Sequence, residues 1–271
     1  MKEYKDYKSR DRRPSDRTRI VERPPHENAA NLIFGRNAVR ELLASGRDID
    51  KIYLQRGERE GSVLRLIGEA SARHIPLIEL ERRKLDELAA GGAHQGIVAV
   101  AAEHAYATVE DMLKLAEERG EKPLLVIADG ILDPQNLGAL IRVAECAGAH
   151  GIIIPKRRAV GLTALVSKTS AGAIEYLPIA RVTNLTSTIE ELKERGFWIY
   201  AADMDGSPYY DTDLRGSAAI VLGSEGEGVS RLVKEKCDFT VSIPLHGRVD
   251  SMNVTSAAAV ILCEAARQRS L

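Results

Sequence analysis

The stretch from Ala218 to Arg269 decides the fold of this chain. It opens with AAIVLGSEGEGVS at residues 218–230 and closes with FTVSIPLHGRVDSMNVTSAAAVILCEAARQR at residues 239–269. Two apolar runs within it, Ala219–Leu222 and Phe239–Ile243, end abruptly in loops of glycines and small polar residues. Open α/β sheets bind their ligands at the carboxyl ends of such strands. The pattern therefore predicts two strands whose following loops form the rim of a pocket.

The first loop, Gly223–Gly228, spaces its glycines as G-x-x-G-x-G. This order is the reverse of the G-x-G-x-x-G fingerprint of dinucleotide sites, so a nicotinamide or flavin site is disfavoured. Glycines at these positions let the backbone approach a small ligand closely. A tight surface turn is the alternative interpretation of the loop.

The second loop leads into an Ala-rich segment that is typical of a helix. Three of its residues have side chains that can cap the first N–H groups of a helix: Ser251, Asn253 and Thr255. Capping does not explain the other polar residues of this loop, which are His246, Arg248 and Asp250.

At this point the sequence resembles a known family. LGSEGEGVS and IPLHGRVDSMNVTSAAA are similar to motifs two and three of the SpoU (TrmH-like) RNA 2′-O-ribose methyltransferases, which belong to the SPOUT superfamily. Motif one of that family, N-x-G-x-x-x-R, should lie upstream, and Asn136–Arg142 (NLGALIR) matches it. Three separate motifs in the right order make the resemblance specific.

The resemblance implies an α/β fold with two domains. Residues 123–271 would form the SPOUT methyltransferase domain, a Rossmann-like parallel sheet whose C-terminal segment is threaded as a trefoil knot. The predicted elements alone indicate an ordinary doubly wound sheet, because true knots are essentially absent from proteins. Residues 31–103 alternate helices and strands, beginning with a helix over LIFGRNAVRELLASG, and resemble the small RNA-binding domain of many SpoU enzymes. The segments that carry this second match are Gly35–Leu43 and Gly91–Ala99.

The remaining segments have simpler interpretations. Residues 1–28 are polar, mildly basic and poor in apolar residues, which predicts a disordered arm, either solvated or in contact with RNA phosphates. Residues 104–122 are expected to be a linker helix that ends at Gly120. No apolar run approaches the roughly 20 residues that span a bilayer, and no signal peptide is evident, so we expect a cytoplasmic protein. The three cysteines lack metal-site spacing and are expected to be buried.

The resemblance also implies a cofactor and a set of site residues. S-adenosylmethionine would contact backbone and apolar groups of Leu222, Gly223, Ile243, Leu245 and Met252. The catalytic positions of the family match Arg142, Asn136, Glu225, Ser251 and Asn253. No metal is required for this methyl transfer. A guanidinium with a pKa above about 12 is a poor base, so we expect Arg142 to clamp a phosphate and the developing alkoxide, oriented by Asn136 and Glu225. From helix spacing alone, without the resemblance, Arg142 would be interpreted as a solvent-exposed arginine with no role at the site.

The charge pattern bears on the partner. A formal net charge of −1 is not typical of a protein that coats nucleic acid non-specifically, so RNA binding must come from local patches and shape. Lys156-Arg157-Arg158, after the strand GIIIP, is one such patch. The family pairs as homodimers, and the apolar face of the final helix either supplies such an interface or packs on its own sheet. That face consists of Ala258, Ile261, Leu262 and Ala265.

The sequence is thus interpreted as an S-adenosylmethionine-dependent 2′-O-ribose methyltransferase acting on structured RNA. The order of its domains makes it most similar to the enzymes that modify guanosine in large-subunit (23S) ribosomal RNA. A transfer-RNA enzyme of the same family is the first alternative. A non-catalytic RNA-binding or ribosome-assembly factor is the second, although the matched motif residues argue against it.

Overall fold

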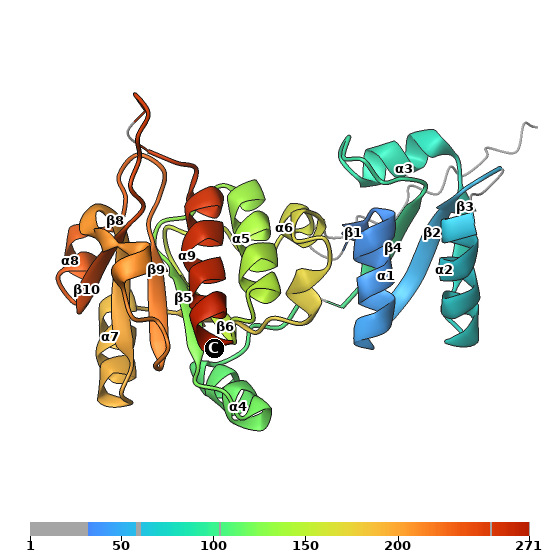
Figure 1. Cartoon of the computed structure of the whole chain (residues 1–271). Helices are drawn as coiled ribbons and strands as arrows, with labels where there is room; N and C mark the ends of the chain where they lie inside the picture. Colours follow the sequence, from blue (N-terminus) through green and yellow to red (C-terminus); the bar gives the residue numbers. More distant parts are fainter. Residues whose placement is uncertain (1–31, 58–60, 103, 250, 271) are drawn as a thin grey trace, which may run out of the picture.

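The computed structural model describes residues 32–270 apart from 58–60, 103 and 250. The chain forms a four-stranded sheet followed by a six-stranded sheet, each covered by helices (Figure 1). The arm predicted at residues 1–28 lies outside the described residues. Within them, no helix is long and apolar enough to cross a bilayer.

The first sheet has the strand order β1-β4-β2-β3, in which β4 is antiparallel to both of its neighbours and β2 is parallel to β3. Its helices cover both faces: α1 and α2 share one core with the sheet, and α3 lies in a second. The bounds are β1 (Leu32–Phe34), α1 (Arg36–Ser45), β2 (Ile49–Gln55), α2 (Gly61–Ala72), β3 (Leu77–Leu80), α3 (Arg82–Leu88) and β4 (Ile97–Ala101).

The start of this domain differs from the prediction of one helix ending at Gly46. Leu32–Phe34 is instead a strand that pairs with β4, and the helix begins only at Arg36. The reason is Gly35, whose φ of 98° lies in a region that other residues rarely adopt and that no helix contains. Gly35 therefore separates the strand from the helix.

The second sheet is parallel throughout, with the order β10-β8-β9-β5-β6-β7. Its strands are β5 (Leu124–Ala128), β6 (Gly151–Pro155), β7 (Ile179–Val182), β8 (Trp198–Pro208), β9 (Ala218–Leu222) and β10 (Phe239–Ser242). The central strands are apolar along their whole length because helices bury both of their faces. The predicted parallel α/β sheet is therefore confirmed, whereas the trefoil knot stays a prediction.

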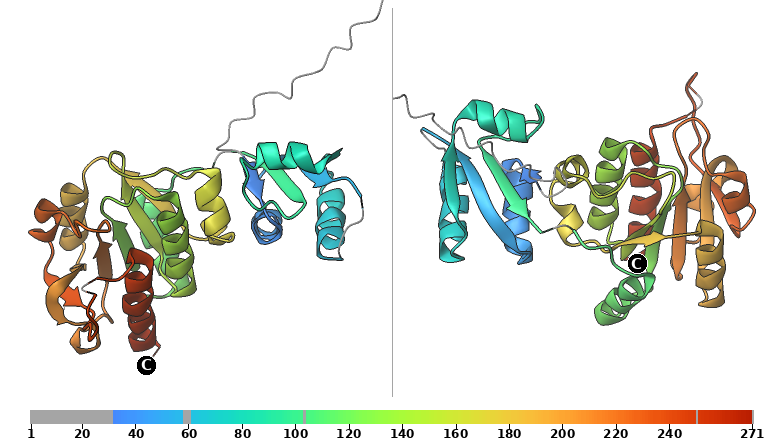
Figure 2. Two further views of the ribbon diagram at one scale, coloured as in Figure 1. Left: turned by 90° about the horizontal axis from the view of Figure 1, so that it is seen from above. Right: turned by 180° about the vertical axis from the view of Figure 1, so that it is seen from behind.

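Two layers of helices enclose this sheet (Figures 1 and 2). One layer, with α5, α6 and α9, shares the larger core, and the other layer, with α4, α7 and α8, shares the core on the opposite face. The bounds are α4 (Val109–Arg119), α5 (Pro134–Cys146), α6 (Ala164–Thr169), α7 (Leu185–Glu194), α8 (Arg231–Lys234) and α9 (Val254–Arg269). The apolar face predicted for the final helix is buried in the larger core, so it packs on its own sheet.

Two other elements are irregular. The helix α6 ends at Thr169 and gives way to a 3₁₀ turn at Ala173–Glu175, because Ala171 and Gly172 both have positive φ. The strand β8 runs on to Pro208. It does so through an excursion, residues 202–206, over which its pairing with β10 is interrupted.

Close packing positions α5, the helix that carries the first motif. Asp133 caps it by accepting a hydrogen bond from the Gln135 N–H at 2.8 Å, and Pro134 occupies its first turn. Gly138 faces α6, where a Cβ would lie 2.7 Å from both the Thr169 Cβ and the Val166 carbonyl oxygen. The glycine of the motif is thus required for α5 and α6 to touch.

The two sheets meet through α1 and the segment around α6. Arg47 forms a 2.8 Å ion pair with Glu175, and only 14% and 3% of the two side chains are exposed. The Tyr176 hydroxyl donates a 2.7 Å hydrogen bond to Glu41, and Gly172 lies directly against that glutamate side chain. Breaking a buried ion pair leaves an uncompensated charge, so loss of either Arg47 or Glu175 would destabilise this contact between the two sheets.

We predict that His150 makes stability depend on pH. Its Nδ1 accepts a hydrogen bond from the Leu124 N–H at 3.0 Å, and its Nε2 lies 3.1 Å from a Glu121 carboxylate oxygen. Burial lowers the pKa of this imidazole below 6.5, so it is neutral in the folded protein. The unfolded chain then binds the proton more readily, and the free energy of unfolding falls as the pH drops through 6.5 and further.

Urea denaturation of the wild type and of His150→Gln between pH 8 and pH 5 measures this effect. The wild type should lose stability on acidification, and the variant should lose less. His246→Gln, at an exposed position, is the control and should follow the wild type. Identical pH profiles for wild type and His150→Gln would refute the assignment.

Candidate active site

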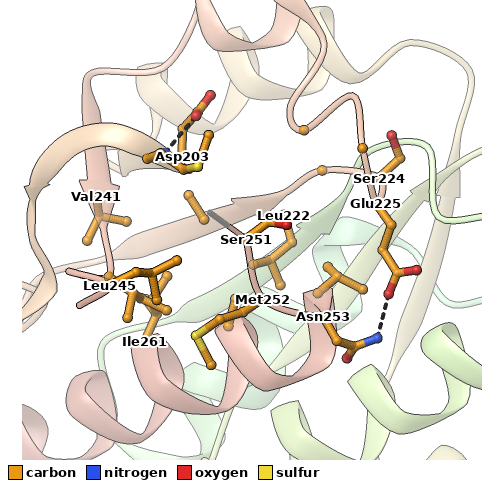
Figure 3. A pocket seen from close by; sticks show the side chains of 18 residues that line it. Asp203, Leu222, Ser224, Glu225, Val241, Leu245, Ser251, Met252, Asn253 and Ile261 are labelled. Carbon is orange, nitrogen blue, oxygen red and sulfur yellow. Dashed lines mark hydrogen bonds between the residues drawn. The ribbon is translucent and has the colours of Figure 1, made fainter. Parts of the chain in front are cut away.

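A cavity of about 740 Å³ opens at the carboxyl ends of three strands, β8, β9 and β10, and beside the start of α9 (Figure 3). Apolar side chains such as Leu222, Val241 and Ile261 line it together with the backbone of the two predicted loops. All five residues assigned to the cofactor line this cavity: Leu222, Gly223, Ile243, Leu245 and Met252. Glu225, Ser251 and Asn253 line it as well. The two loops therefore share one pocket, as their positions after the strands predict.

The glycine loop after β9 is closed on itself. Ser224 and Gly228 exchange two backbone hydrogen bonds, at 3.1 and 3.0 Å. A Cβ on Gly223 would collide with the backbone of Gly228 and Val229, and Gly226 has a φ of 93°. The loop is thus a tight turn that also forms a wall of the cavity, whereas close approach of its backbone to a ligand stays a prediction.

Side chains from the three motifs meet at one edge of the cavity. Asn136 on α5 donates a hydrogen bond from Nδ2 to the Glu225 Oε1 at 3.1 Å. Asn253 donates from its Nδ2 to the Asn136 Oδ1 at 3.1 Å, and also to the Glu225 Oε1 (Figure 3). No donor among the described residues contacts the second oxygen of the Glu225 carboxylate. Three segments far apart in the sequence therefore converge on one carboxylate.

Asn253 also performs the capping role that its position predicts. Its Oδ1 accepts hydrogen bonds from the N–H groups of Thr255 at 3.0 Å and Ser256 at 3.3 Å, at the start of α9. Ser251 lies on the cavity wall and has no hydrogen bond of its own among the described residues. Of the three candidate caps, only Asn253 caps the helix.

Arg142 does not join this network. It follows Asn136 by six residues on α5, so the two side chains are separated by about 9 Å along the helix and by roughly 120° around it. Arg142 is exposed and makes no hydrogen bond or ion pair within the described part of the chain. The expectation that Asn136 and Glu225 orient Arg142 is therefore not met, because helix geometry points them in different directions.

The excursion of β8 is a wall of the cavity that the sequence analysis missed. Ala202, Asp203 and Met204 line the cavity there. The Asp203 carboxylate accepts a 2.7 Å hydrogen bond from the Met204 N–H and a 2.7 Å ion pair from Lys234, which also binds Asp205 at 2.8 Å. These two carboxylates raise the pKa of Lys234.

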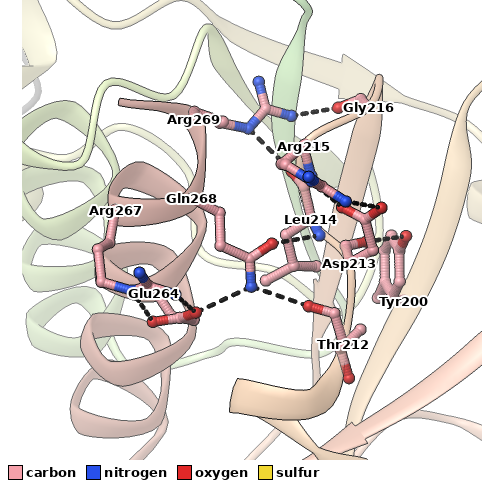
Figure 4. A network of polar contacts seen from close by, with 10 residues as sticks. All are labelled: Tyr200, Thr212, Asp213, Leu214, Arg215, Gly216, Glu264, Arg267, Gln268 and Arg269. Atoms are coloured by element: carbon pink, nitrogen blue, oxygen red, sulfur yellow. Dashed lines mark hydrogen bonds and ion pairs between the residues drawn. The ribbon is translucent and has the colours of Figure 1, made fainter. Parts of the chain in front are cut away.

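A second polar cluster lies at the opposite edge of the sheet (Figure 4). The Arg269 guanidinium donates to four backbone carbonyls, those of Lys122, Pro123, Leu214 and Gly216. Gln268 accepts the Leu214 N–H at 2.8 Å and donates to the Thr212 carbonyl at 2.9 Å. These side chains are occupied by the backbone, so this cluster anchors the last turn of α9 and is structural.

The cysteines and other potential ligands do not form a site. Burial raises the pKa of the Cys237 thiol to about 12, so it is not a nucleophile near neutral pH. Cys146 and Cys263 are exposed, contrary to the expectation of burial, because they lie on outward faces of α5 and α9. No group of three or more His, Cys, Asp or Glu residues in the described chain is placed to hold a metal ion.

Comparison with known proteins decides which family has this site. Residues 123–263 match the model of the SpoU rRNA methylase family, and residues 32–107 match that of the RNA 2′-O-ribose methyltransferase substrate-binding domain. The chain belongs to the SpoU (TrmH) family. The resemblance of the three motifs is thereby confirmed.

Relatives and solved structures agree with this assignment. YacO of Bacillus subtilis, described as a TrmH family tRNA/rRNA methyltransferase, is 45% identical over 241 residues, which cover 89% of this chain and 96% of YacO. A TrmH family protein of Staphylococcus aureus is 42% identical over 88% of this chain and 96% of its own. The SpoU methyltransferase AviRb of Streptomyces viridochromogenes, solved with AdoMet, has a TM-score of 0.73 at 25% identity, covering 88% of this chain and 90% of AviRb.

The protein is therefore an RNA 2′-O-ribose methyltransferase that uses S-adenosylmethionine. The cavity fits that cofactor, because its volume lies within the range of roughly 300–1,000 Å³ usual for such ligands. Its apolar floor suits an adenine ring, and the Glu225 carboxylate at its edge suits a cationic sulfonium.

We predict that Gly223→Ala weakens binding of S-adenosylmethionine. The added methyl group has no space against Gly228 and Val229, so the loop must open and the cavity wall must move. Calorimetric titration should show the Kd rising at least about tenfold, which is about 1.4 kcal/mol. Gly216→Ala, where a Cβ meets nothing closer than a Trp198 carbon at 3.8 Å, should bind normally. Unchanged affinity in a folded Gly223→Ala protein would contradict the steric argument.

Proposed function

We propose that this SpoU enzyme methylates the 2′-hydroxyl of a guanosine in large-subunit (23S) ribosomal RNA, as a cytoplasmic homodimer. The observation that carries the proposal is the convergence of Asn136, Glu225 and Asn253 at the mouth of the cofactor-sized cavity. The choice of ribosomal RNA rests on the order of the two domains and on the Gly91–Ala99 segment. A transfer-RNA substrate is the second candidate, since relatives such as YacO are described as tRNA/rRNA methyltransferases.

Bound S-adenosylmethionine supplies an activated methyl group, and the chain must supply alignment and assist loss of the hydroxyl proton. Positioning of this kind can be worth about 7–11 kcal/mol. We propose that Glu225, held at Oε1 by Asn136 and Asn253, uses its second carboxylate oxygen to accept a hydrogen bond from the ribose hydroxyl. Ser251, on the cavity wall nearby, would contact the same ribose.

Arg142 is proposed to bind a phosphate of the substrate. Its guanidinium is exposed and has no partner in the described part of the chain, which leaves its five N–H groups available. A planar guanidinium can hold phosphate oxygens in a bidentate manner. The buried face of α9 packs in the core of its own domain, so it cannot form the contact between the two subunits of the proposed homodimer. That contact must use other surfaces, such as the small residues on the outward face of α9.

The substrate proposal is tested with RNA that lacks the modification. The protein is incubated with labelled S-adenosylmethionine and either ribosomal or transfer RNA, and alkali-resistant linkages are mapped, because a 2′-O-methyl group blocks cleavage. We expect label at a guanosine of 23S ribosomal RNA. Label confined to transfer RNA would replace the ribosomal proposal, and tight RNA binding without label would indicate an assembly factor.

Asn253 provides a test that separates catalysis from folding. Asn253→Ser keeps a helix cap but loses the Nδ2 donor, whereas Asn253→Ala loses both. We expect both variants to lose methyl transfer about a hundredfold, because Glu225 is released. Only Asn253→Ala should also lose about 1 kcal/mol of stability. If Asn253→Ser retained wild-type turnover, Asn253 would be a cap alone.

A further inference from the structure

A run of three cations, Lys156, Arg157 and Arg158, forms what we term the basic loop, at the carboxyl end of β6. All three side chains are exposed, and none makes a hydrogen bond or ion pair with the described residues. Some other surface cations of this domain are paired, as in Arg195–Glu110 at 2.6 Å and Lys236–Glu190, but no other three consecutive residues of its described part are all exposed cations without a pair. With a net charge of −1 for the whole chain, an unpaired cluster of three is a local positive patch.

Backbone contacts on both sides fix the basic loop. The Lys156 N–H donates to the Val182 carbonyl at 2.7 Å, and the Arg181 guanidinium donates to the Lys156 carbonyl at 3.1 Å. Further along, the Val160 N–H donates to the carbonyl of Ile131 at 3.1 Å. Ile131 lies in the connection that leads directly into α5 and Asn136. The loop is therefore attached to the segment that positions the active site.

The basic loop also leads toward the substrate-binding domain. It continues into α6, which lies between α5 and β1 (Figure 1). At the end of α6, the Lys168 ammonium sits 5.0 Å from the centre of the Phe34 ring, and Gly172 packs against Glu41. An RNA strand held by that domain and reaching Asn136, at the start of α5, would pass the basic loop.

We propose that the basic loop binds the phosphate backbone of the substrate RNA between the substrate-binding domain and the methylated ribose. This inference rests on the proposed function, because it takes RNA as the ligand. Contacts to phosphates carry no sequence information and give affinity that falls as salt is added. The loop thus supplies a local attraction for phosphates on a chain whose net charge is only −1.

The test uses a charge-matched pair of variants. Lys156→Gln with Arg157→Gln removes two charges from the loop, while Arg158 is kept because its φ of 56° makes that position sensitive to any change. The control, Arg119→Gln with Lys122→Gln, removes two exposed charges near the start of β5, at the opposite edge of the same sheet. Binding of 23S ribosomal RNA fragments is measured between 50 and 300 mM potassium chloride.

We expect the loop variant to bind RNA about tenfold or more weakly and the slope of log affinity against log salt to become shallower by about 1–2. The KM for RNA should rise, while the affinity for S-adenosylmethionine and the kcat at saturating RNA stay unchanged. The control should match the wild type. An equal loss of RNA affinity in the loop variant and the control, or an unchanged salt slope in the loop variant, would overturn the proposal. The basic loop would then be a candidate site for a different partner, such as an acidic protein.

The experiment also separates the two proposals. If the wild type methylates 23S ribosomal RNA but the loop variant keeps its salt slope, the proposal for the basic loop fails and the proposed function stands. If the loop controls the salt slope although the wild type does not methylate 23S ribosomal RNA, the proposed function fails and the phosphate contact stands.

Discussion

The side-chain amide of Asn253 has two hydrogen-bonding ends, and the protein depends on both. Its oxygen begins α9 by accepting the first free N–H groups of that helix, and its nitrogen holds Glu225 and Asn136. Serine, threonine or aspartate would cap the helix equally well, but none of them offers a donor of this reach. One residue therefore fixes both the start of the last helix and the Glu225 carboxylate at the edge of the cavity, so a shift of the carboxylate would disturb the helix start.

Close approach of backbone segments is the second constraint on the site. Gly138 lets α6 lie against α5, Gly172 lets the Glu41 side chain lie against the turn after α6, and Gly223 lets the loop carrying Glu225 close. Only Gly172 has a positive φ among these three, so the other two glycines are needed for space and not for backbone conformation. A series of close contacts at glycines therefore runs from the substrate-binding domain to α5, and a methyl group on Gly138 or Gly172 would push its neighbours apart.

The sequence predicted the parts of this structure that depend on local pattern. Buried parallel strands are apolar along their length, so β6 and β9 were predicted, and the loop after β9 was predicted to form part of the pocket rim. The parts that were missed depend on tertiary contacts. The strand β1 is too short for a periodic signal, and the excursion of β8 is held by Lys234 from another element. The direction of Arg142, in contrast, follows from its six-residue spacing from Asn136 on one helix and could have been derived from the sequence. Motif spacing identifies which residues gather, whereas their orientation across different elements comes only from the folded chain.

The polar groups at the two ends of the strands in the six-stranded sheet differ in whether they are paired. At the amino edge, Arg269 satisfies four carbonyls and His150 is buried neutral, so polar groups there are paired with the backbone and fixed. At the carboxyl edge, the Ser251 side chain and one oxygen of the Glu225 carboxylate have no hydrogen-bond partner in the described chain. Unpaired polar groups are tolerated only where solvent or a ligand reaches them, and removing water around them strengthens their interaction with a charged ligand. The hydrogen bonds at the amino edge stabilise the sheet, so the polar groups at the carboxyl edge are not needed for stability and can interact with a ligand.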